Sequence, residues 1–224
     1  MLQEKKTALI AGASGLIGNE LLHYLLEGKE YERVIAIVRS PLHLNHTKLE
    51  EKIISFDDMN QYKDLFAVDD VYCCLGTTIK KAKTKESMYK IDVEYPIQLA
   101  KLASEHGAKR FLIVSSMNAN AHSSIWYAKM KGELEEKLSK VPFENIMIMR
   151  PSLLLGERDE FRFGEKAGEL IFMIFPFLFI GPLKKYKAIQ GRTVALAMYK
   201  LAQMNKKGIR IYPSEQIEQI AASK

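Results

Sequence analysis

The chain has 224 residues, a length that suits one α/β domain of the larger kind. Hydrophobic residues make up 47% and charged residues 27% of the sequence, which is typical of a soluble globular protein with ample material for a core. The formal net charge of +6 fits the binding of polyanions in general and is too small to indicate a nucleic-acid partner.

The cysteines and the N-terminus indicate the compartment. Cys73 and Cys74 are adjacent, and neighbouring side chains of a strand point to opposite faces, so we do not expect them to pair. Without a disulfide framework, a reducing environment is favoured. Residues 1–6 are polar and lead directly into an expected strand, which leaves no room for a signal peptide. The sequence therefore predicts a cytoplasmic protein.

In chain order, short apolar runs alternate with longer segments of helical periodicity. The first half predicts strands at 7–11, 33–38, 52–56 and 71–75, with a helix at 16–27. The second half predicts helices at 87–105, 127–138 and 193–203, and strands at 111–114, 146–149 and 209–212. Such alternation predicts an α/β fold, a doubly wound parallel sheet with right-handed crossovers and helices on both faces.

We expect a single domain over residues 1–224, with its core at about 6–155 and a smaller substrate-side part at about 156–224. The nearly uncharged segment 170–183 lies in that second part and contains Pro176, Gly181 and Pro182. It is shorter than the roughly 20 apolar residues that span a bilayer, so we expect no transmembrane helix. A buried helix, a substrate lid or a subunit contact, as in a homodimer, is favoured over peripheral membrane contact.

A glycine-rich turn follows the first expected strand, with the spacing Gly12-x-x-Gly15-x-x-Gly18. Such glycines permit a tight turn, let a pyrophosphate approach the backbone, and let the helix pack closely on the strand. The N-terminus of the next helix offers unbonded N–H groups to phosphate, and Ser14 adds a hydroxyl donor. Because the turn joins a strand to an amphipathic helix, it predicts a nicotinamide-dinucleotide site of the Rossmann type.

The end of the second expected strand indicates which dinucleotide binds. An NAD-preferring site places Asp or Glu there to accept hydrogen bonds from ribose hydroxyls. Here the strand ends in Arg39 and Ser40. An arginine at this position can pair with the 2′-phosphate of NADP, although an ordinary surface arginine is the alternative. The sequence favours NADP and leaves NAD open.

Tyr127 and Lys131 stand four residues apart in an expected helix and therefore share one face. A phenol with its ordinary pKa near 10 is a poor proton shuttle at neutral pH, and a nearby ammonium favours the phenolate. This pair suits proton transfer during carbonyl reduction. Ser115 and Ser116 follow the fifth expected strand, and a hydroxyl there would place a substrate carbonyl against the tyrosine; Ser116 is slightly favoured.

Other chemistry-bearing residues carry weaker signals. The basic run of Lys80, Lys81, Lys83 and Lys85 is interpreted as a solvated loop, with contact to an acidic substrate or a cofactor phosphate as the alternative. His43 and His46 share a loop without a third ligand nearby, so no metal site is expected.

Several motifs together resemble one superfamily. They are Gly-Ala-Ser-Gly at 12–15, Cys-Cys-Leu-Gly-Thr-Thr at 73–78, Ser-Ser at 115–116, Tyr127 with Lys-Gly-Glu at 131–133, and Arg-Pro-x-Leu-Leu within 150–155. With these motifs the chain resembles the extended or atypical short-chain dehydrogenases/reductases, and within them the Tat-interacting oxidoreductase family and its bacterial relatives. The likeness runs from about residue 6 to 162.

The resemblance implies a set of cofactor contacts. The pyrophosphate would lie on Ser14, Gly15, Leu16 and Ile17, and the adenosine 2′-phosphate on Arg39 and Ser40. Leu75 and Gly76 would pass beside the adenine-side ribose, with Thr77 following as a further contact. Tyr127 and Lys131 would flank the nicotinamide ribose, Leu154 would pack near the nicotinamide, and Arg162 would reach over from the following loop.

Two positions depart from the family pattern. Many relatives carry an Asp directly after the third strand, where this chain has Ser55 with Asp57 nearby. Asp92 stands where many extended members have an Asn, which puts their usual water relay to the lysine in doubt.

The sequence thus favours an NADP-dependent oxidoreductase that acts on a small carbonyl or alcohol. The alternative is a non-catalytic NADPH-binding regulator, redox sensor or assembly factor that acts through protein contacts.

Overall fold

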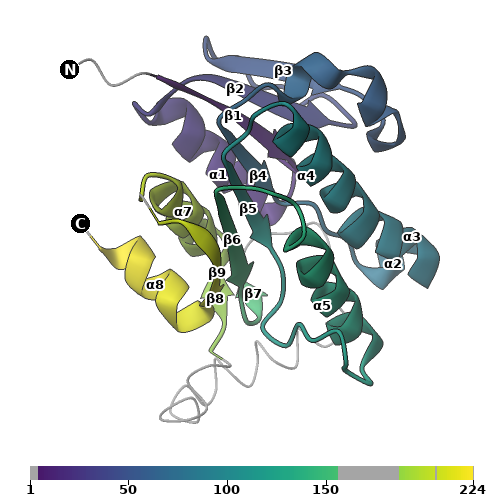
Figure 1. The fold of residues 1–224 in the computed structure, drawn as a ribbon. Coiled ribbons are helices and arrows are strands. Elements are labelled where there is room, and N and C mark those ends of the chain that lie inside the picture. Colours follow the sequence, from purple (N-terminus) through teal and green to yellow (C-terminus); the bar gives the residue numbers. More distant parts are fainter. Residues whose placement is uncertain (1–4, 156–186, 205, 224) are drawn as a thin grey trace.

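Seven parallel strands form the central sheet of the computed structural model, which describes residues 5–155, 187–204 and 206–223 (Figure 1). Their order across the sheet is β3-β2-β1-β4-β5-β6-β9. The strands are β1 (Lys6–Ala11), β2 (Tyr31–Val38), β3 (Leu49–Ile53), β4 (Asp70–Cys73), β5 (Arg110–Val114), β6 (Asn145–Arg150) and β9 (Gly208–Pro213). The strand order reverses between β1 and β4, and in such sheets a crevice opens there at the carboxyl ends.

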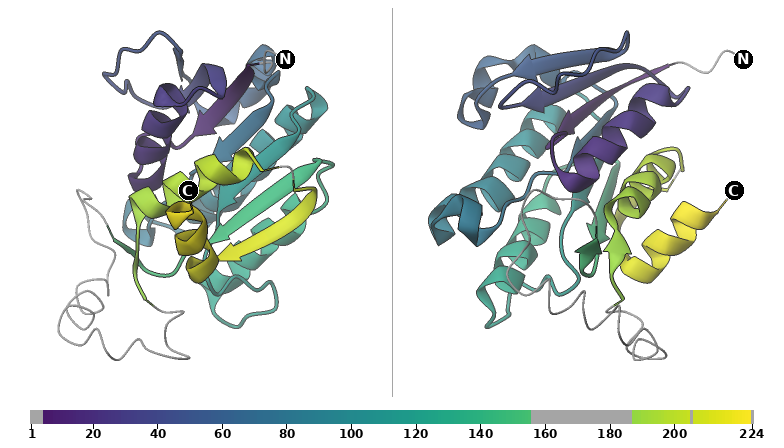
Figure 2. Two further views of the ribbon diagram at one scale, coloured as in Figure 1. Left: turned by 90° about the vertical axis from the view of Figure 1, so that its left-hand side faces the viewer. Right: turned by 180° about the vertical axis from the view of Figure 1, so that it is seen from behind.

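Helices cover both faces of this sheet, as Figure 2 shows from two further sides. One face carries α1 (Leu16–Glu27), α7 (Gly191–Ala202) and α8 (Ser214–Ala222). The other carries α3 (Lys85–Tyr89), η3 (Lys90–Glu94), α4 (Tyr95–Glu105) and α5 (Trp126–Leu138). Shorter elements complete the described chain: η1 (Phe56–Gln61), η2 (Lys63–Phe66), α2 (Ile79–Ala82), and the strand pair β7 (Leu154–Leu155) and β8 (Ile189–Gln190).

The continuous apolar character of β1 follows from this layering. Leu9 and Ala11 pack toward α4 and α5, whereas Ala8 and Ile10 pack toward α1 and α7. Because successive side chains of a strand point to opposite faces, a strand that is covered on both sides needs apolar residues at every position. The doubly wound parallel sheet expected from the sequence is confirmed.

The differences from the expected elements have local causes. The third strand ends at Ile53, because the Ser55 hydroxyl accepts a hydrogen bond from the Asp57 N–H and begins η1. The helix expected at 87–105 is divided into α3, the π-helical turn η3 and α4. The last helix, α8, was not expected.

Several expectations lie outside the described residues, among them Arg162 and the apolar segment 170–183. Within the described ranges, no helix is long and apolar enough to cross a membrane. The C-terminal part nevertheless returns to the sheet: β9 pairs with β6, and α7 packs against α1.

A buried polar cluster lies at the amino ends of the strands, opposite the glycine turn. Asp70 is fully buried and forms an ion pair of 2.5 Å with Arg110. The Tyr31 hydroxyl donates to the same carboxylate at 2.6 Å and lies 2.8 Å from the Tyr72 hydroxyl. Burial, and then the Asp70 charge, raise the pKa of Tyr31 well above its usual value, so this phenol stays protonated and donates.

Asp70→Asn should strongly destabilise the fold. The substitution keeps the shape but leaves Arg110 without its buried counter-charge, and breaking such a pair costs about 3 kcal/mol or more. Chemical denaturation measures the change in the free energy of unfolding. The exposed Asp64→Asn is the matched control and should stay within about 0.5 kcal/mol of the parent. Equal stabilities of the two variants would contradict the assignment.

Candidate active site

The glycine turn is built by close backbone approach. Gly12 has a positive φ of 88°, and a Cβ placed on it would lie 2.6 Å from the Cys74 carbonyl carbon. A Cβ on Gly18 would collide with the Gly12 carbonyl oxygen. Any side chain at either position would therefore push helix α1 away from the ends of β1 and β4.

Gly15 serves the turn differently. A Cβ there would meet only the Gly12 carbonyl oxygen, at 3.3 Å, and otherwise point into open space. Gly15 is also the N-cap of α1, and no side chain caps the helix there. The first N–H groups of this helix therefore open onto the adjoining cleft, an arrangement that accepts an anionic group such as a pyrophosphate.

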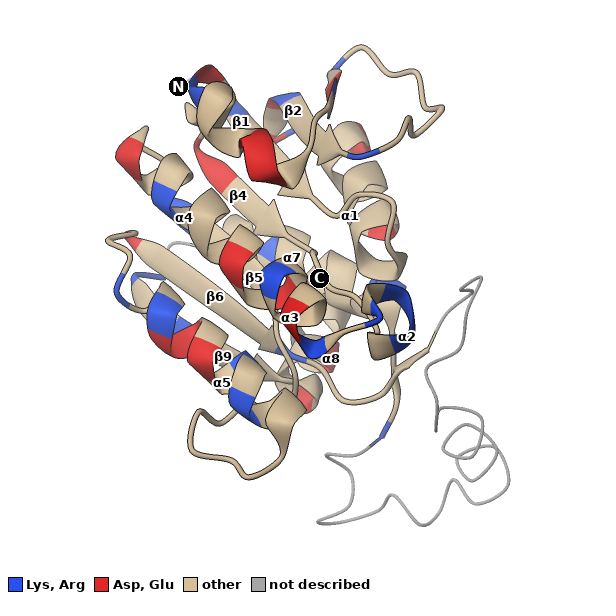
Figure 3. Ribbon diagram, turned by 90° about the vertical axis from the view of Figure 1, so that its right-hand side faces the viewer, with Lys and Arg blue, Asp and Glu red and all other residues tan. Residues whose placement is uncertain are grey.

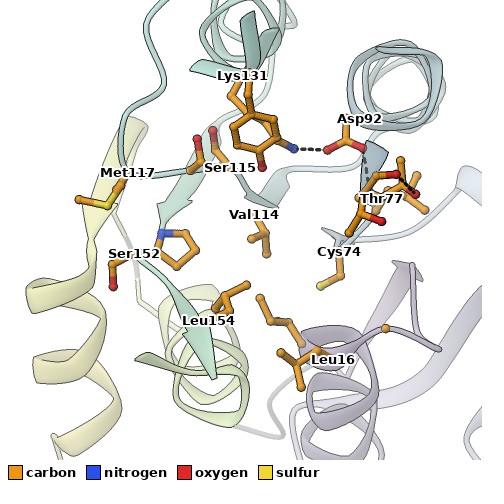
Figure 4. A pocket seen from close by; sticks show the side chains of 18 of the residues that line it. Leu16, Cys74, Thr77, Asp92, Val114, Ser115, Met117, Lys131, Ser152 and Leu154 are labelled. Atoms are coloured by element: carbon orange, nitrogen blue, oxygen red, sulfur yellow. Dashed lines mark hydrogen bonds and ion pairs between the residues drawn. The ribbon is translucent and has the colours of Figure 1, made fainter. Parts of the chain in front are cut away.

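A cleft of about 500 Å³ lies at the carboxyl ends of the strands (Figure 4). Most residues expected at the site line it: Ser14, Gly15, Leu16, Ile17, Leu75, Gly76, Thr77, Ser115, Ser116, Tyr127, Lys131 and Leu154. The turn, the loop after β4, the loop after β5, helix α5 and the segment after β6 with β7 thus contribute to one cavity. These residues and the open turn fit a dinucleotide.

Four expected residues lie elsewhere in the described structure. Gly12 and Gly18 form the base of the turn and are absent from the described cleft lining. Arg39 and Ser40 are exposed beyond the end of β2, also outside that lining.

The structure adds further lining residues that the sequence did not single out as site residues. They are Cys74, Thr78, Lys81, Asp92, Val114, Met117, Asn118, Ile125, Ala128, Pro151 and Ser152. Cys74, Pro151 and Ser152 follow directly on β4 or β6, so for these three the place after a carboxyl strand end was the signal that could have identified them.

Lys131 is held by a buried ion pair. Its Nζ lies 2.7 Å from Oδ1 of Asp92, and the two side chains are only 3% and 1% exposed. The other carboxylate oxygen of Asp92 accepts the backbone N–H of Thr77 at 2.9 Å. Figure 4 shows the carboxylate between the lysine and the loop after β4. Asp92, noted in the sequence as a departure, is thus the direct partner of the lysine.

The two adjacent serines have different environments. The Ser115 hydroxyl donates to Glu135 at 2.5 Å, and that carboxylate also binds Arg150 at 2.5 Å. The Ser116 hydroxyl oxygen is buried and has no hydrogen-bond partner among the described residues. A buried hydroxyl without a partner is costly, and one that lines a cleft is suited to bind a ligand oxygen. The geometry therefore distinguishes the serines in favour of Ser116.

Gly132 sets the position of helix α5 against the loop after β5. A Cβ at Gly132 would collide with the backbone of Asn120 and Ala121. The Asn120 N–H donates to the Ala128 carbonyl at 2.9 Å, which holds the loop on the helix. This contact fixes the register in which Tyr127 and Lys131 face the cleft.

The basic run includes helical residues beside the cleft. Lys80 and Lys81 belong to α2, and Lys85 begins α3. Figure 3 shows this positive charge concentrated around α2. Lys81 lines the cleft, so the run is not merely a solvated loop. In the described part of the chain, no three His, Cys, Asp or Glu side chains group as a metal site would need.

The sheet order, the glycine turn and the cleft define the class of Rossmann-type NAD(P)-binding proteins. The chain belongs to the NAD dependent epimerase/dehydratase family, whose model matches residues 8–197. The resemblance to short-chain dehydrogenases/reductases of the Tat-interacting type is confirmed by the relatives that follow.

Protein HTATIP2 of Rattus norvegicus is 33% identical over 177 residues, which cover 77% of this chain and 73% of that protein. Protein FMP52, mitochondrial, of Eremothecium gossypii is 34% identical over 152 residues, 68% of either chain. Among solved structures, Bordetella bronchiseptica WbmG in complex with NAD superposes with a TM-score of 0.68 at 15% identity, covering 95% of this chain and 74% of the other. That likeness shows the fold.

The relatives correct one expectation. The FMP52 proteins of Eremothecium gossypii and Saccharomyces cerevisiae are named mitochondrial. The cytoplasmic location expected from the cysteines and the polar N-terminus is therefore contradicted. Neither feature could decide it, because unpaired cysteines and a polar N-terminal segment are not particular to cytoplasmic proteins.

The two cysteines should be unreactive in the folded protein. Burial raises the pKa of Cys73 to about 12, and burial also raises the pKa of Cys74 well above its usual range. The thiolate is the reacting form, so at pH 8 both thiols should react with a disulfide reagent at least about 100-fold more slowly than an ordinary cysteine. Stopped-flow absorbance measurements on native and denatured protein check this difference in reaction rate.

The exposed Ser124→Cys provides the matched control, because a thiol at that position is open to the reagent. One rapidly reacting thiol is expected in this variant and none in the parent. Rapid reaction of the parent before unfolding would contradict the raised pKa of the two thiols.

Proposed function

We propose that this protein is an NADP-dependent oxidoreductase of the atypical short-chain type. It transfers hydride to or from a small carbonyl or alcohol, with Tyr127 as the proton donor or acceptor. The observation that carries the proposal is that one cleft joins the open glycine turn to Tyr127, Lys131 and the Ser116 hydroxyl, which has no hydrogen-bond partner among the described residues. Family membership supports nicotinamide-dinucleotide chemistry in general.

The cleft residues divide into those that hold the dinucleotide and those that face the substrate. Gly15, Leu16 and Ile17 would bind the pyrophosphate through the N-terminal turn of α1. Leu75, Gly76 and Thr77 would follow its adenine side, and Leu154 would pack near the nicotinamide. The bound cofactor would supply the hydride when a carbonyl is reduced and accept it when an alcohol is oxidised.

The protein supplies the proton and the alignment. Ser116 would donate a hydrogen bond to the substrate oxygen and bring it to the phenol of Tyr127. Lys131 would bind the nicotinamide ribose from the same helix face as the tyrosine. Ser115 is engaged with Glu135 and so serves the packing of β5 on α5.

The preference for NADP rests on the register of β1 and β2. Ala11, the last residue of β1, pairs with Ile37, so Arg39 lies two residues beyond the level of the end of β1. The side chain is exposed there. A guanidinium at this place can form a bidentate contact with a 2′-phosphate, and no carboxylate precedes it on the strand end to bind ribose hydroxyls.

Tyr127→Phe should lower turnover by about 10²- to 10⁴-fold, because it removes the transferable proton. NADPH oxidation with a panel of aldehydes, ketones and quinones measures this. NADPH affinity, followed by nucleotide fluorescence, should stay within about twofold of the parent, because the ring is retained.

Tyr89→Phe is the matched control, because it removes a phenol that binds Glu133 away from the described cleft lining. Its turnover should equal that of the parent. If NADPH binds tightly but no substrate of the panel is reduced, the proposal gives way to a non-catalytic NADPH-binding regulator.

Arg39→Asp should shift the cofactor preference toward NADH. Loss of a charge-assisted contact costs about 1.5–3 kcal/mol, so NADPH should bind roughly 10- to 100-fold more weakly, while NADH affinity holds or improves. Calorimetric titrations with the two nucleotides measure both constants. Arg210→Asp, an exposed charge reversal on the edge strand β9, is the control. An unchanged preference in Arg39→Asp would mean that another group binds the phosphate.

A further inference from the structure

We infer that Asp92 positions Lys131 beside the nicotinamide ribose and offsets its charge, so that the cleft accepts the oxidised cofactor almost as well as the reduced one. The inference rests on the proposed function in one respect, the placement of the nicotinamide next to Lys131.

The positioning follows from how three separate segments meet at one carboxylate. Lys131 comes from α5, Asp92 from η3, and Thr77 from the loop after β4. Oδ1 of Asp92 lies 2.7 Å from the lysine nitrogen, and Oδ2 accepts the Thr77 N–H at 2.9 Å. Each carboxylate oxygen thus holds a different wall of the cleft, and displacement of Asp92 would release both.

The π-helical turn η3 accompanies this arrangement. The N–H of Tyr95 bonds to the Lys90 carbonyl, five residues back. Such a turn widens a helix and redirects side chains, and π-turns are frequent at functional sites. Asp92 lies within this turn and is 1% exposed, although the neighbouring Glu94 is exposed.

The charge balance follows from burial. Among the described residues that line the cleft, Lys81, Asp92 and Lys131 are the charged ones. Asp92 and Lys131 are almost completely buried, so water and salt screen them little, and the carboxylate cancels most of the lysine's field locally. A lone lysine in that position would instead project a net positive charge into the cleft.

A net positive charge there would discriminate between the two forms of the cofactor. The nicotinamide ring is cationic when oxidised and neutral when reduced. An uncompensated ammonium beside it would repel only the oxidised form and favour the reduced one. The carboxylate of Asp92 removes this bias, which suits a site that must bind both forms in turn.

Asp92→Asn removes the negative charge at nearly constant shape. The single amide oxygen can accept from either Lys131 or Thr77, while the NH₂ group faces the other donor, so one of the two contacts is lost with the charge. A ratio of two affinities cancels any loss that affects both cofactor forms equally. We expect the ratio of the dissociation constants of NADP⁺ and NADPH to rise roughly fivefold or more. The affinity for 2′-phospho-ADP-ribose, which lacks the nicotinamide, should match that of the parent. Calorimetry with each nucleotide measures all three constants without turnover.

Asp57→Asn is the control, because it removes an exposed carboxylate that pairs with Lys90. The ratio of the NADP⁺ and NADPH dissociation constants in this variant should equal that of the parent. The reciprocal variant Lys131→Met leaves the carboxylate without the ammonium, so the ratio should fall below the parent's. If Asp92 had a purely structural role, its substitution would weaken the binding of both cofactor forms equally and leave the ratio of their dissociation constants unchanged.

The outcomes separate this inference from the proposed function. An unchanged ratio in a folded Asp92→Asn would overturn the charge balance, while the proposed function still stood on the Tyr127→Phe result. If the parent bound neither nicotinamide form, the proposed function itself would fail. If Asp92→Asn did not fold, the ratio in Lys131→Met would decide: a lower value supports the charge balance, and an unchanged value overturns it.

Discussion

The arrangement of the cleft depends on how closely the glycine turn approaches the end of β4. Gly12 leaves β1 with a positive φ, and its position would bring any Cβ against the backbone of Cys74 and Leu75. Gly18 then lets α1 rest directly on the Gly12 carbonyl. Because the strands are parallel and in register, this contact also sets the distance from the helix N-terminus to the loops after β4, β5 and β6. A side chain at Gly12 or Gly18 would move the N-terminus of α1 away from the residues that face the substrate.

One buried ion pair lies at the amino ends of the strands and another at their carboxyl ends, and the two pairs have different roles. Asp70 and Arg110 lie at the amino ends of β4 and β5 among tyrosine hydroxyls, with no described cleft beside them. Asp92 and Lys131 lie at the opposite end and line the cleft. Burial of a charge pair costs desolvation in both places. The first pair satisfies the hydrogen bonds of a packed core, whereas the second holds a charged group where a ligand can reach it.

Much of the fold was predictable because local patterns determine it. The leucine spacing and Gly28 gave the bounds of α1, and unbroken apolar runs identified the covered strands. The rest depends on distant contacts. The π-turn at Asp92 is accompanied by an ion pair with Lys131 on another helix, a contact between residues distant in sequence. Periodicity does not report such a contact, so by itself it predicts one continuous helix. Helix α8 is only nine residues long and its apolar stripe consists of Ile217, Ile220 and Ala221, while β7 and β8 are two residues long, so each gives a weak signal. Of the site, spacing predicted the turn and the Tyr127–Lys131 pair, but it did not determine which of the two serine hydroxyls is held by Glu135 and which is left for a ligand.

The different environments of Ser115 and Ser116 affect how related sequences should be aligned. Neighbouring side chains at a strand end point to opposite sides, so one of these hydroxyls ties β5 to Glu135 and the other remains for a ligand. A gap misplaced by a single position would exchange the two in any comparison. A relative with one serine at this site can therefore lack either a packing contact or a reacting group. Whether it also keeps an acid at position 135 indicates which of the two was lost.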